Sequence, residues 1–453
     1  LSRSIPTTKG VLGIATCDKG LPAMMMALAG TPDKPTIIMP GGVTLAVENG
    51  EDTAKIQSIG SRFAQNEVTL EYAQDMGCKS CASPGGGCQF LGTAGTSQVV
   101  AESLGMTLPH AALTPSGTNL WIDTGRRSAI ALKNLIDKNI KTKDILTSKA
   151  FENAMIVHAA CGGSTNLILH LPAVAHAVKE NIMKVEDWIR INKLTPRLVD
   201  VLPNGPNGFP TSVFFSSGGV PEVMLKLRDE GLLNLDVITS TGLTLKENLD
   251  WWEQSEKRDF VRKQLRNTRN IDPEDVVHSL KNSKKKNMTS TVTFPKGNIS
   301  PEGSVVKSTA IDKTVIDDDG VYRKIGPARI FISEADAIKA VKDKGENGVK
   351  AGDIMVIVCG GPKGTGMQEV AQITIALKYL SYGKEVALIT DGRFSGVSTG
   401  ACIGHIGPEA LDGGPIGKLK ENDLIEINID TINLEGSINL IGEDGQNKGV
   451  KWG

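Results

Sequence analysis

A cysteine, an aspartate and a lysine follow one another directly after a short apolar segment near the start of the chain. Residues 11–15 are apolar and predict a buried strand, and Pro22 followed by AMMMAL predicts a helix with proline in its first turn. In open α/β sheets, ligands bind just beyond the carboxyl ends of strands, which is where Cys17, Asp18 and Lys19 fall. A thiol beside an amine at this place favours metal or cofactor chemistry. Taken by itself, the segment also fits a buried cysteine beside a surface lysine.

Cys78, Cys81 and Cys88 form a second group, in the motifs CKSC and SPGGGC. The C-x2-C spacing is typical of zinc sites and redox pairs, and glycines beside Cys88 favour a backbone that wraps closely around an inorganic cluster. No second C-x2-C and no paired histidines follow at a spacing suited to zinc. An iron–sulfur cluster needs three or four thiolates, which Cys17 and Cys88 could help to supply. The other cysteines lie in apolar segments and are predicted to be buried: Cys161, Cys359 and Cys402.

The motif CGGSTN precedes a predicted helix over residues 165–178. Glycines before hydroxyl residues at a helix start present backbone N–H groups that suit a carboxylate or a phosphate, and an ordinary helix cap is the alternative. Ser164 and Thr165 are therefore candidate substrate-binding residues. The histidines on or beside this helix and the one predicted at 150–159 are expected in core or capping positions: His158, His170 and His176.

Two loops in the second half follow predicted strands and carry charged or hydroxyl side chains. In GGPKGTGMQE the order of lysine and glycines does not fit a phosphate-binding loop, and Glu369 is predicted in the first turn of a helix, able to reach a metal. In DGRFSG, Ser395 lies between Arg393 and a glycine and could act as a nucleophile or a base. The G-x-S-x-G motif and a hydrolase triad order are absent.

Length and patterning predict a two-domain α/β protein, because 453 residues exceed one ordinary core. Short apolar strands, such as 36–39, alternate with helices up to about residue 280, which predicts a layered α/β/α domain with a mainly parallel sheet over residues 1–285. The run KNSKKK at 281–286 is predicted to be a solvated surface linker. A β-rich second domain is predicted over 289–453, from strand-like segments at 289–294, 303–311, 328–333, 353–360, 384–390 and 423–430.

Composition narrows the class of protein. A formal net charge of −1 gives no electrostatic basis for a nucleic-acid or anionic-membrane partner. No apolar run reaches the roughly 18 residues that a spanning helix needs. The seven cysteines are odd in number and unevenly spaced, which argues against a disulfide framework. The sequence therefore predicts a cytoplasmic enzyme.

Taken together, the motifs resemble the dihydroxy-acid and sugar-acid dehydratase family, whose members are iron–sulfur, magnesium-dependent hydro-lyases. The resemblance covers essentially the whole chain and implies an N-terminal layered domain and a barrel-like, swivelling C-terminal domain. Within the family it is greatest to the branch that acts on D-xylonate. It is carried by CDKGLPAMMMAL, GGGCQFLGTAGTSQVVAESLG, GGSTNLILHLPA, GNISPEGSVVKSTAI, GPKGTGMQE and DGRFSGVSTGACIGHIGPEALDGGPIG.

The resemblance implies two cofactors and their ligands. Cys17 and Cys88 match ligands of an iron–sulfur cluster of the two-iron or four-iron type. Lys19 matches a lysine that is carbamylated and binds Mg²⁺, which is chemically sensible because a carbamate offers hard oxygens where an ammonium repels the cation. Glu369 matches a magnesium carboxylate. The family also has an upstream segment with a magnesium aspartate, after which this sequence begins, so we expect the chain to be a fragment.

The reaction implied is loss of water from a 2,3-dihydroxy acid, giving a 2-keto-3-deoxy acid. Ser395 matches the proposed base, and Arg393 beside it is a candidate substrate-binding residue. D-xylonate is the predicted substrate; the alternatives are another aldonate such as galactonate or arabinonate, 6-phosphogluconate and 2,3-dihydroxyisovalerate. Alternatives from other classes are a non-catalytic iron–sulfur redox protein and a zinc-binding interaction module. The resemblance also implies a homodimer or homotetramer.

Overall fold

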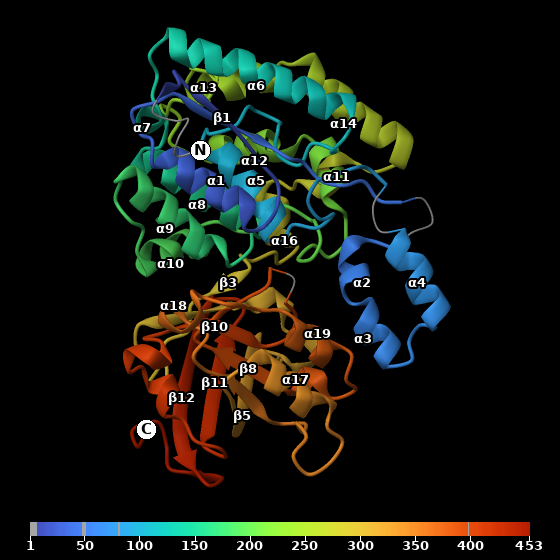
Figure 1. Cartoon of the computed structure of the whole chain (residues 1–453), viewed down its shortest axis with the longest axis vertical. Coiled ribbons are helices and arrows are strands. Elements are labelled where there is room, and N and C mark those ends of the chain that lie inside the picture. The colour runs from blue at the N-terminus through green and yellow to red at the C-terminus, as the bar shows by residue number, and fades with distance from the viewer. Residues whose placement is uncertain (1–6, 48–50, 80–81, 397) are drawn as a thin grey trace. The chain divides into compact units, whose positions relative to one another are not determined.

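The computed structural model describes residues 7–47, 51–79, 82–396 and 398–453, and the chain divides into two compact units (Figure 1). The first comprises Leu1–Gln57 and Asp75–Ser290, and the second comprises Ser58–Gln74 and Thr291–Gly453. The segment 58–74 thus belongs to the second unit, although its neighbours in sequence belong to the first. Within that unit the Tyr379 hydroxyl donates to Ser58 Oγ at 2.9 Å.

The predicted strand at 11–15 is confirmed as β1 (Val11–Ala15), which pairs in parallel with β2 (Thr36–Pro40). Helices α1 (Gly20–Ala29) and α6 (Asn119–Asp137) both pack against the two strands. Gly13 allows α1 to approach, because a Cβ there would lie 2.7 Å from Met24 Sδ. In the described part of the first unit, β1 and β2 are the paired strands, and further parallel pairing consists of isolated bridges from Val43 to Gly87 and to Pro115.

The rest of the first unit is helical. Its central helix, α5 (Thr93–Ser103), is buried at every residue and packs against α1, α8 (Ser148–Cys161), α9 (Leu167–Val178) and α12 (Gly219–Asp229) (Figure 1). The predicted helices at 150–159 and 165–178 are therefore confirmed as α8 and α9. Further helices in the chain are α2 (Thr53–Gln57), α3 (Ile59–Ala64), α4 (Leu70–Cys78), α7 (Thr142–Ile145), α10 (Val185–Leu194), α11 (Thr211–Ser216), α13 (Leu245–Glu253), α14 (Glu256–Arg269) and α15 (Pro273–Val276).

The prediction of a linker at KNSKKK is wrong. These residues form most of helix α16 (Leu280–Lys285), which begins where Ser279 Oγ accepts a hydrogen bond from the Asn282 amide. Leu280 and Ser283 are buried, and the Ser283 hydroxyl donates to the carbonyl oxygen of Arg197. The lysines are exposed, as their composition suggests. The composition did not indicate the Ser279 cap or the buried side of the helix, which is why the helix was not predicted.

In the described part of the second unit, nine strands form one mixed sheet in the order β13-β12-β11-β5-β6-β8-β10-β4-β3 (Figure 1). The four central strands run parallel, and antiparallel strands flank them. All six predicted strand segments contain strands, whereas β10, β12 and β13 of this sheet were not among them. The strands are β3 (Val292–Thr293), β4 (Gly303–Lys307), β5 (Val321–Phe331), β6 (Ile354–Ile357), β8 (Ala387–Thr390), β10 (Cys402–Gly407), β11 (Leu424–Asp430), β12 (Glu435–Glu443) and β13 (Gln446–Asn447).

The sheet curls on itself. Just after β3, Lys296 forms a parallel bridge to Ser437 of β12, and the Asn298 side chain bonds the Leu440 backbone. The chain next to β3, at one end of the strand order, is thereby joined to β12, the second strand from the other end. The predicted fold class, α/β with a barrel-like second domain, is confirmed.

Each face of this sheet has its own apolar core. One face buries Val306, Ile389 and Ile403 among others. The other buries Leu388, Phe394 and Cys402 beneath helices α17 (Glu334–Lys342) and α19 (Gln372–Lys378). Among the residues described, no helix is both long and apolar enough to cross a membrane.

Candidate active site

Cys17, Asp18 and Lys19 occupy the turn between β1 and α1. The carbonyls of Cys17 and Lys19 accept hydrogen bonds from the amides of Leu21 and Ala23 at 3.0 and 3.1 Å, so the helix starts directly on these residues. The Asp18 carboxylate accepts two hydrogen bonds, one from the Lys19 ammonium and one from Cys17 Sγ at 3.4 Å. Sequence reasoning gave Asp18 no role, although it stands inside the CDK motif. The structure shows that its carboxylate holds the two candidate ligands together.

The environment of this turn shifts two pKa values. Burial tends to raise the pKa of the Asp18 carboxyl, but the hydrogen bond and charge of Lys19 outweigh it, so the pKa lies below its usual value. Although Cys17 is exposed, loss of water from around its sulfur raises the pKa of the thiol. The turn therefore favours an ionised carboxylate beside a protonated thiol when no cation is bound.

The Cys17 and Cys88 loops pack on the same turn, Gly41–Gly42, which follows β2. The Gly41 amide donates to Ala15 at the end of β1, and a Cβ on Gly41 would meet the Thr16 side chain. On the other side, the Gly87 amide donates to the Gly42 carbonyl at 2.8 Å. The carboxyl ends of parallel strands meet at one edge of a sheet, and this edge collects both cysteine loops.

Cys88 is half-buried and receives a hydrogen bond at 3.5 Å from the Gln57 side-chain amide. Gly86, two residues before Cys88, has a packing reason, because a Cβ there would lie 2.6 Å from the backbone nitrogen of Thr44. That glycine is therefore required by the protein's own backbone, not only by the cluster that sequence reasoning invoked. Cys81 and the side chain of Cys78 lie outside the described residues.

In the second unit, Glu369, Arg393 and Ser395 lie on one face of a small parallel strand pair. Strand β7 (Glu369–Val370) pairs with β9 (Arg393–Phe394), with Glu369 opposite Arg393, and the Ser395 amide continues the ladder by donating to Val370 at 3.0 Å. Side chains alternate along a strand, so buried Val370 and Phe394 face the core while the three polar residues face the other way and are half-exposed. The structure thus brings the three together.

The prediction that Glu369 opens a helix is wrong, because α19 begins three residues later, at Gln372. A two-residue strand leaves no alternation to detect, and its partner lies far away in sequence. Pairing with Arg393 decides its conformation.

Asp391 fixes the base of these loops. Its buried carboxylate accepts hydrogen bonds from the amides of Cys359, Gly360 and Ala410 at 3.1, 2.8 and 2.9 Å. It therefore ties the loop after β6, which leads through α18 (Pro362–Thr365) to Glu369, to the loop after β8, which leads to Ser395. Sequence reasoning missed this residue, and its position directly after an apolar strand was the available signal.

Ser164 and Thr165 are both buried before α9. The Ser164 amide donates to Thr96 Oγ1 at 3.1 Å, and its hydroxyl shares a 2.8 Å hydrogen bond with Thr93. These contacts fasten the helix start to α5. A role in substrate binding stays a prediction.

The other histidines and cysteines largely follow expectation. His158 is buried, its Nε2 lies 2.9 Å from the Ser164 carbonyl, and burial lowers its pKa to about 4. Cys161 and Cys402 are buried as predicted, whereas Cys359 is only partly covered and has φ of 64°.

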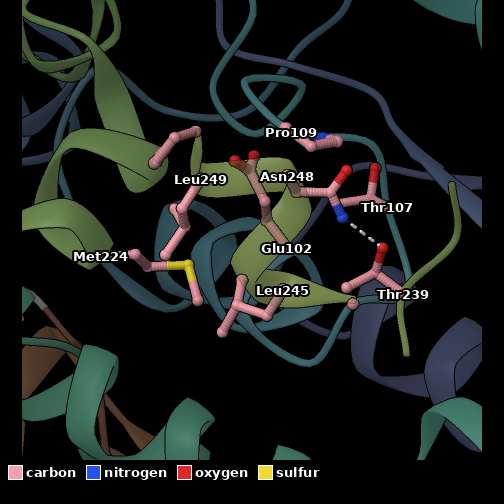
Figure 2. Close-up of a pocket in the computed structure, with 10 residues that line it drawn as sticks. Glu102, Thr107, Pro109, Met224, Thr239, Leu245, Asn248 and Leu249 are labelled. Carbon is pink, nitrogen blue, oxygen red and sulfur yellow. Dashed lines mark hydrogen bonds between the residues drawn. The ribbon is translucent and has the colours of Figure 1, made fainter. Parts of the chain in front are cut away.

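Glu102 is a buried carboxyl that sequence reasoning did not single out. It lies in α5 at a pocket of about 20 Å³, room for one water molecule, with Thr107, Thr239 and Asn248 around it (Figure 2). Its carboxylate accepts hydrogen bonds from three consecutive amides, those of residues 110–112, at 2.7, 3.1 and 2.8 Å. Burial nevertheless dominates and raises its pKa from 4.5 to about 7.

The donor chemistry suits the two expected cofactors. Among the described residues, no three His, Cys, Asp or Glu side chains are close enough together to hold a metal ion. Cys17 and Cys88 nevertheless offer the soft thiol ligands that iron–sulfur clusters use, and neither is fully buried. Asp18 and Glu369 offer the hard carboxylate oxygens that suit Mg²⁺.

Comparison with known proteins decides the family. The N-terminal domain profile of the dihydroxy-acid/6-phosphogluconate dehydratases matches residues 4–248, and the C-terminal domain profile matches residues 275–446. The chain belongs to this dehydratase family. It is therefore a hydro-lyase, an enzyme that removes water from its substrate. This assignment decides against the redox-protein and zinc-module alternatives.

Several members of the dehydratase family are similar along nearly the whole chain. The D-xylonate dehydratases YagF and YjhG of Escherichia coli K12 are each 59% identical, over 98% of this chain and 67% of their own length. The dihydroxy-acid dehydratase of Picrophilus torridus is 37% identical over 94% of this chain and 72% of its own. The chain is thus more similar in sequence to these two D-xylonate dehydratases than to this dihydroxy-acid dehydratase.

Proposed function

We propose that the chain dehydrates a sugar acid, D-xylonate, to its 2-keto-3-deoxy acid, using an iron–sulfur cluster and Mg²⁺. The observation that supports the substrate is the 59% identity to two proteins named D-xylonate dehydratase, against 36–38% to relatives named dihydroxy-acid dehydratase. This identity extends over 98% of the chain. A small sugar acid is thus the substrate class.

In the first unit, Cys17 and Cys88 would hold the cluster, and Lys19 would help to hold Mg²⁺. Lys19 must first become a carbamate: its neutral amine attacks CO₂, an N–C bond forms and a proton is released. In the structure the Lys19 side chain forms an ion pair with the Asp18 carboxylate. A carbamate on Lys19 is anionic, so it would break this ion pair, and the Asp18 carboxylate would be available to help hold Mg²⁺.

In the second unit, Glu369 would bind Mg²⁺, and Ser395 Oγ would take the proton from C2 of the substrate. For this, Ser395 would act as its alkoxide, and the electron pair of the C2–H bond would form the C2=C3 bond as the C3–O bond breaks. The hydroxide would leave as water with the proton that Ser395 took from C2, and the resulting enol would tautomerise to the 2-keto acid. Arg393 shares the face of Glu369 and Ser395, and its guanidinium suits the substrate carboxylate. When bound, the two inorganic groups supply Lewis acidity to the developing negative charge and to the leaving hydroxyl.

The test is anaerobic purification, with iron, sulfide and magnesium analysis, followed by assay for 2-keto acid. The panel contains D-xylonate, galactonate, arabinonate, 6-phosphogluconate and 2,3-dihydroxyisovalerate. We expect the highest kcat/KM with D-xylonate. Ser395→Ala should abolish turnover with iron content unchanged, while the exposed control Ser381→Ala should match the wild type. Cys88→Ala should lower the iron content itself.

The outcomes separate the parts of the proposal. A higher kcat/KM on another acid would replace D-xylonate as the substrate, and full turnover by Ser395→Ala would remove the serine from the reaction. Protein that lacks iron and sulfide, yet dehydrates the acid, would overturn the cluster assignment. The homodimer or homotetramer stays a prediction, which sedimentation of the same preparation measures.

A further inference from the structure

Lys307, the last residue of β4, is a buried lysine. The residue belongs to the sequence motif GNISPEGSVVKSTAI, and 4% of its surface is exposed. Its ammonium donates a hydrogen bond to the carbonyl oxygen of Gly396 at 2.9 Å. Lysine is almost never fully buried unless its charge is bound by a partner. The Gly396 carbonyl is one such partner, so the buried ammonium holds this part of the backbone.

The carbonyl that it binds belongs to the residue after the candidate base. Ser395, Gly396 and Ser398 form a turn, here called the serine turn, in which the Ser398 amide donates to the Ser395 carbonyl at 2.9 Å. The turn is tied to β7 through the Ser395 amide and to α19 through a 3.1 Å hydrogen bond between the hydroxyls of Thr374 and Ser398. Lys307 adds a third tie, from a different strand.

Strand geometry explains how a residue of β4 reaches this turn. Val306 lies opposite Ile403 of β10, and both belong to the core on one face of the large sheet. Neighbouring side chains on a strand point to opposite faces, so Lys307 points to the other face, the one that buries Phe394. The residues after Phe394 are those of the serine turn.

We propose that Lys307 is a positioning residue, which holds Ser395 in place for proton abstraction by clamping the Gly396 carbonyl. The inference rests on the proposed function, since it assigns Ser395 the role of base. Without the ammonium, the carbonyl loses a charged donor and the turn can rotate about the peptide that follows the serine. A displacement of about 1 Å in a reacting group lowers turnover on the order of 100-fold.

Lys307→Met tests the proposal, because methionine keeps the unbranched stem and removes the ammonium. We expect kcat on the preferred acid to fall at least tenfold while KM stays within threefold. Amide hydrogen exchange of the serine turn should quicken, with exchange elsewhere in the second unit unchanged. The control Thr293→Val alters the paired strand β3 at a buried hydroxyl that has no hydrogen-bond partner among the described residues, and it should leave both readouts at wild-type values.

Lys307→Gln serves as a second variant, with a neutral, shorter side chain. Either variant that folds, judged by circular dichroism, and keeps kcat within twofold of the wild type overturns the proposal. If neither variant folds, the lysine supports the domain as a whole, which also overturns it. If the wild type dehydrates none of the acids, the proposed function fails, yet hydrogen exchange still reports whether Lys307 holds the turn.

Discussion

Glu102→Gln in helix α5 should remove a pH dependence from the stability of the first unit. The carboxylate accepts hydrogen bonds from the backbone amides of residues 110–112, yet burial raises its pKa from 4.5 to about 7. Glutamine is nearly the same shape and cannot ionise. Its NH₂ group, however, must face at least one of the three amide donors. The variant therefore separates the hydrogen bonds from the charge.

The sign follows from proton binding. Below pH 4.5 both the folded and the unfolded states hold the proton, so ionisation has no effect on stability. Between pH 4.5 and 7 the unfolded chain loses its proton first, and the free energy of unfolding falls as the pH rises. At about 1.4 kcal/mol per pH unit, the rise in pKa corresponds to about 3 kcal/mol, reached above pH 7. At pH 4.5, the glutamine variant should be less stable than the wild type by about 1–3 kcal/mol, because one backbone amide loses its hydrogen-bond acceptor.

The assay is urea unfolding at several values between pH 4.5 and 8, followed by tryptophan fluorescence, since four of the five tryptophans lie in the first unit. The wild type should lose about 3 kcal/mol relative to Glu102→Gln across this range. Glu230→Gln, which makes the same change of charge at an exposed position, is the control. Parallel stability curves for wild type and Glu102→Gln would refute the reasoning, because they would mean that the buried carboxyl ionises as it does in water.

Two further substitutions test the supports of the candidate site by urea unfolding. Asp391→Asn should lower the free energy of unfolding by about 1–3 kcal/mol, because the new NH₂ group must face one of the three backbone amides that now donate to the carboxylate. Asp318→Asn, at an exposed position, is the control. Equal stability of the two variants would contradict the conclusion that Asp391 anchors these loops. Gly42→Ala should cost at least about 1–3 kcal/mol, because φ is 75° and a Cβ would lie 2.0 Å from the Thr114 carbonyl. Gly60→Ala, in α3 with open space around it, should instead raise stability by about 0.5–1 kcal/mol, and a similar loss in both glycine variants would show that the contact is unimportant.

Local patterns predicted much of the secondary structure. The strand 11–15 and the helix after Pro22 follow from apolar runs and from proline in the first turn, both of which act within a few residues. The same is true of the longer helices of the first unit and of the apolar strands of the second. Patterns failed where apolar residues are sparse, as in α16, whose start depends on the Ser279 cap.

By itself, the sequence determined the candidate chemistry: thiols at Cys17 and Cys88, an amine at Lys19 and a serine beside an arginine, in motifs that name a dehydratase family. Only the tertiary structure decided that Glu369, Arg393 and Ser395 share a face, that Gly41–Gly42 gathers both cysteine loops, and that Lys307 reaches the serine turn. The physical reason is that these contacts join residues far apart in the chain. Two-residue strands and buried ions are stable only against the partners that folding provides, and no local pattern records those partners.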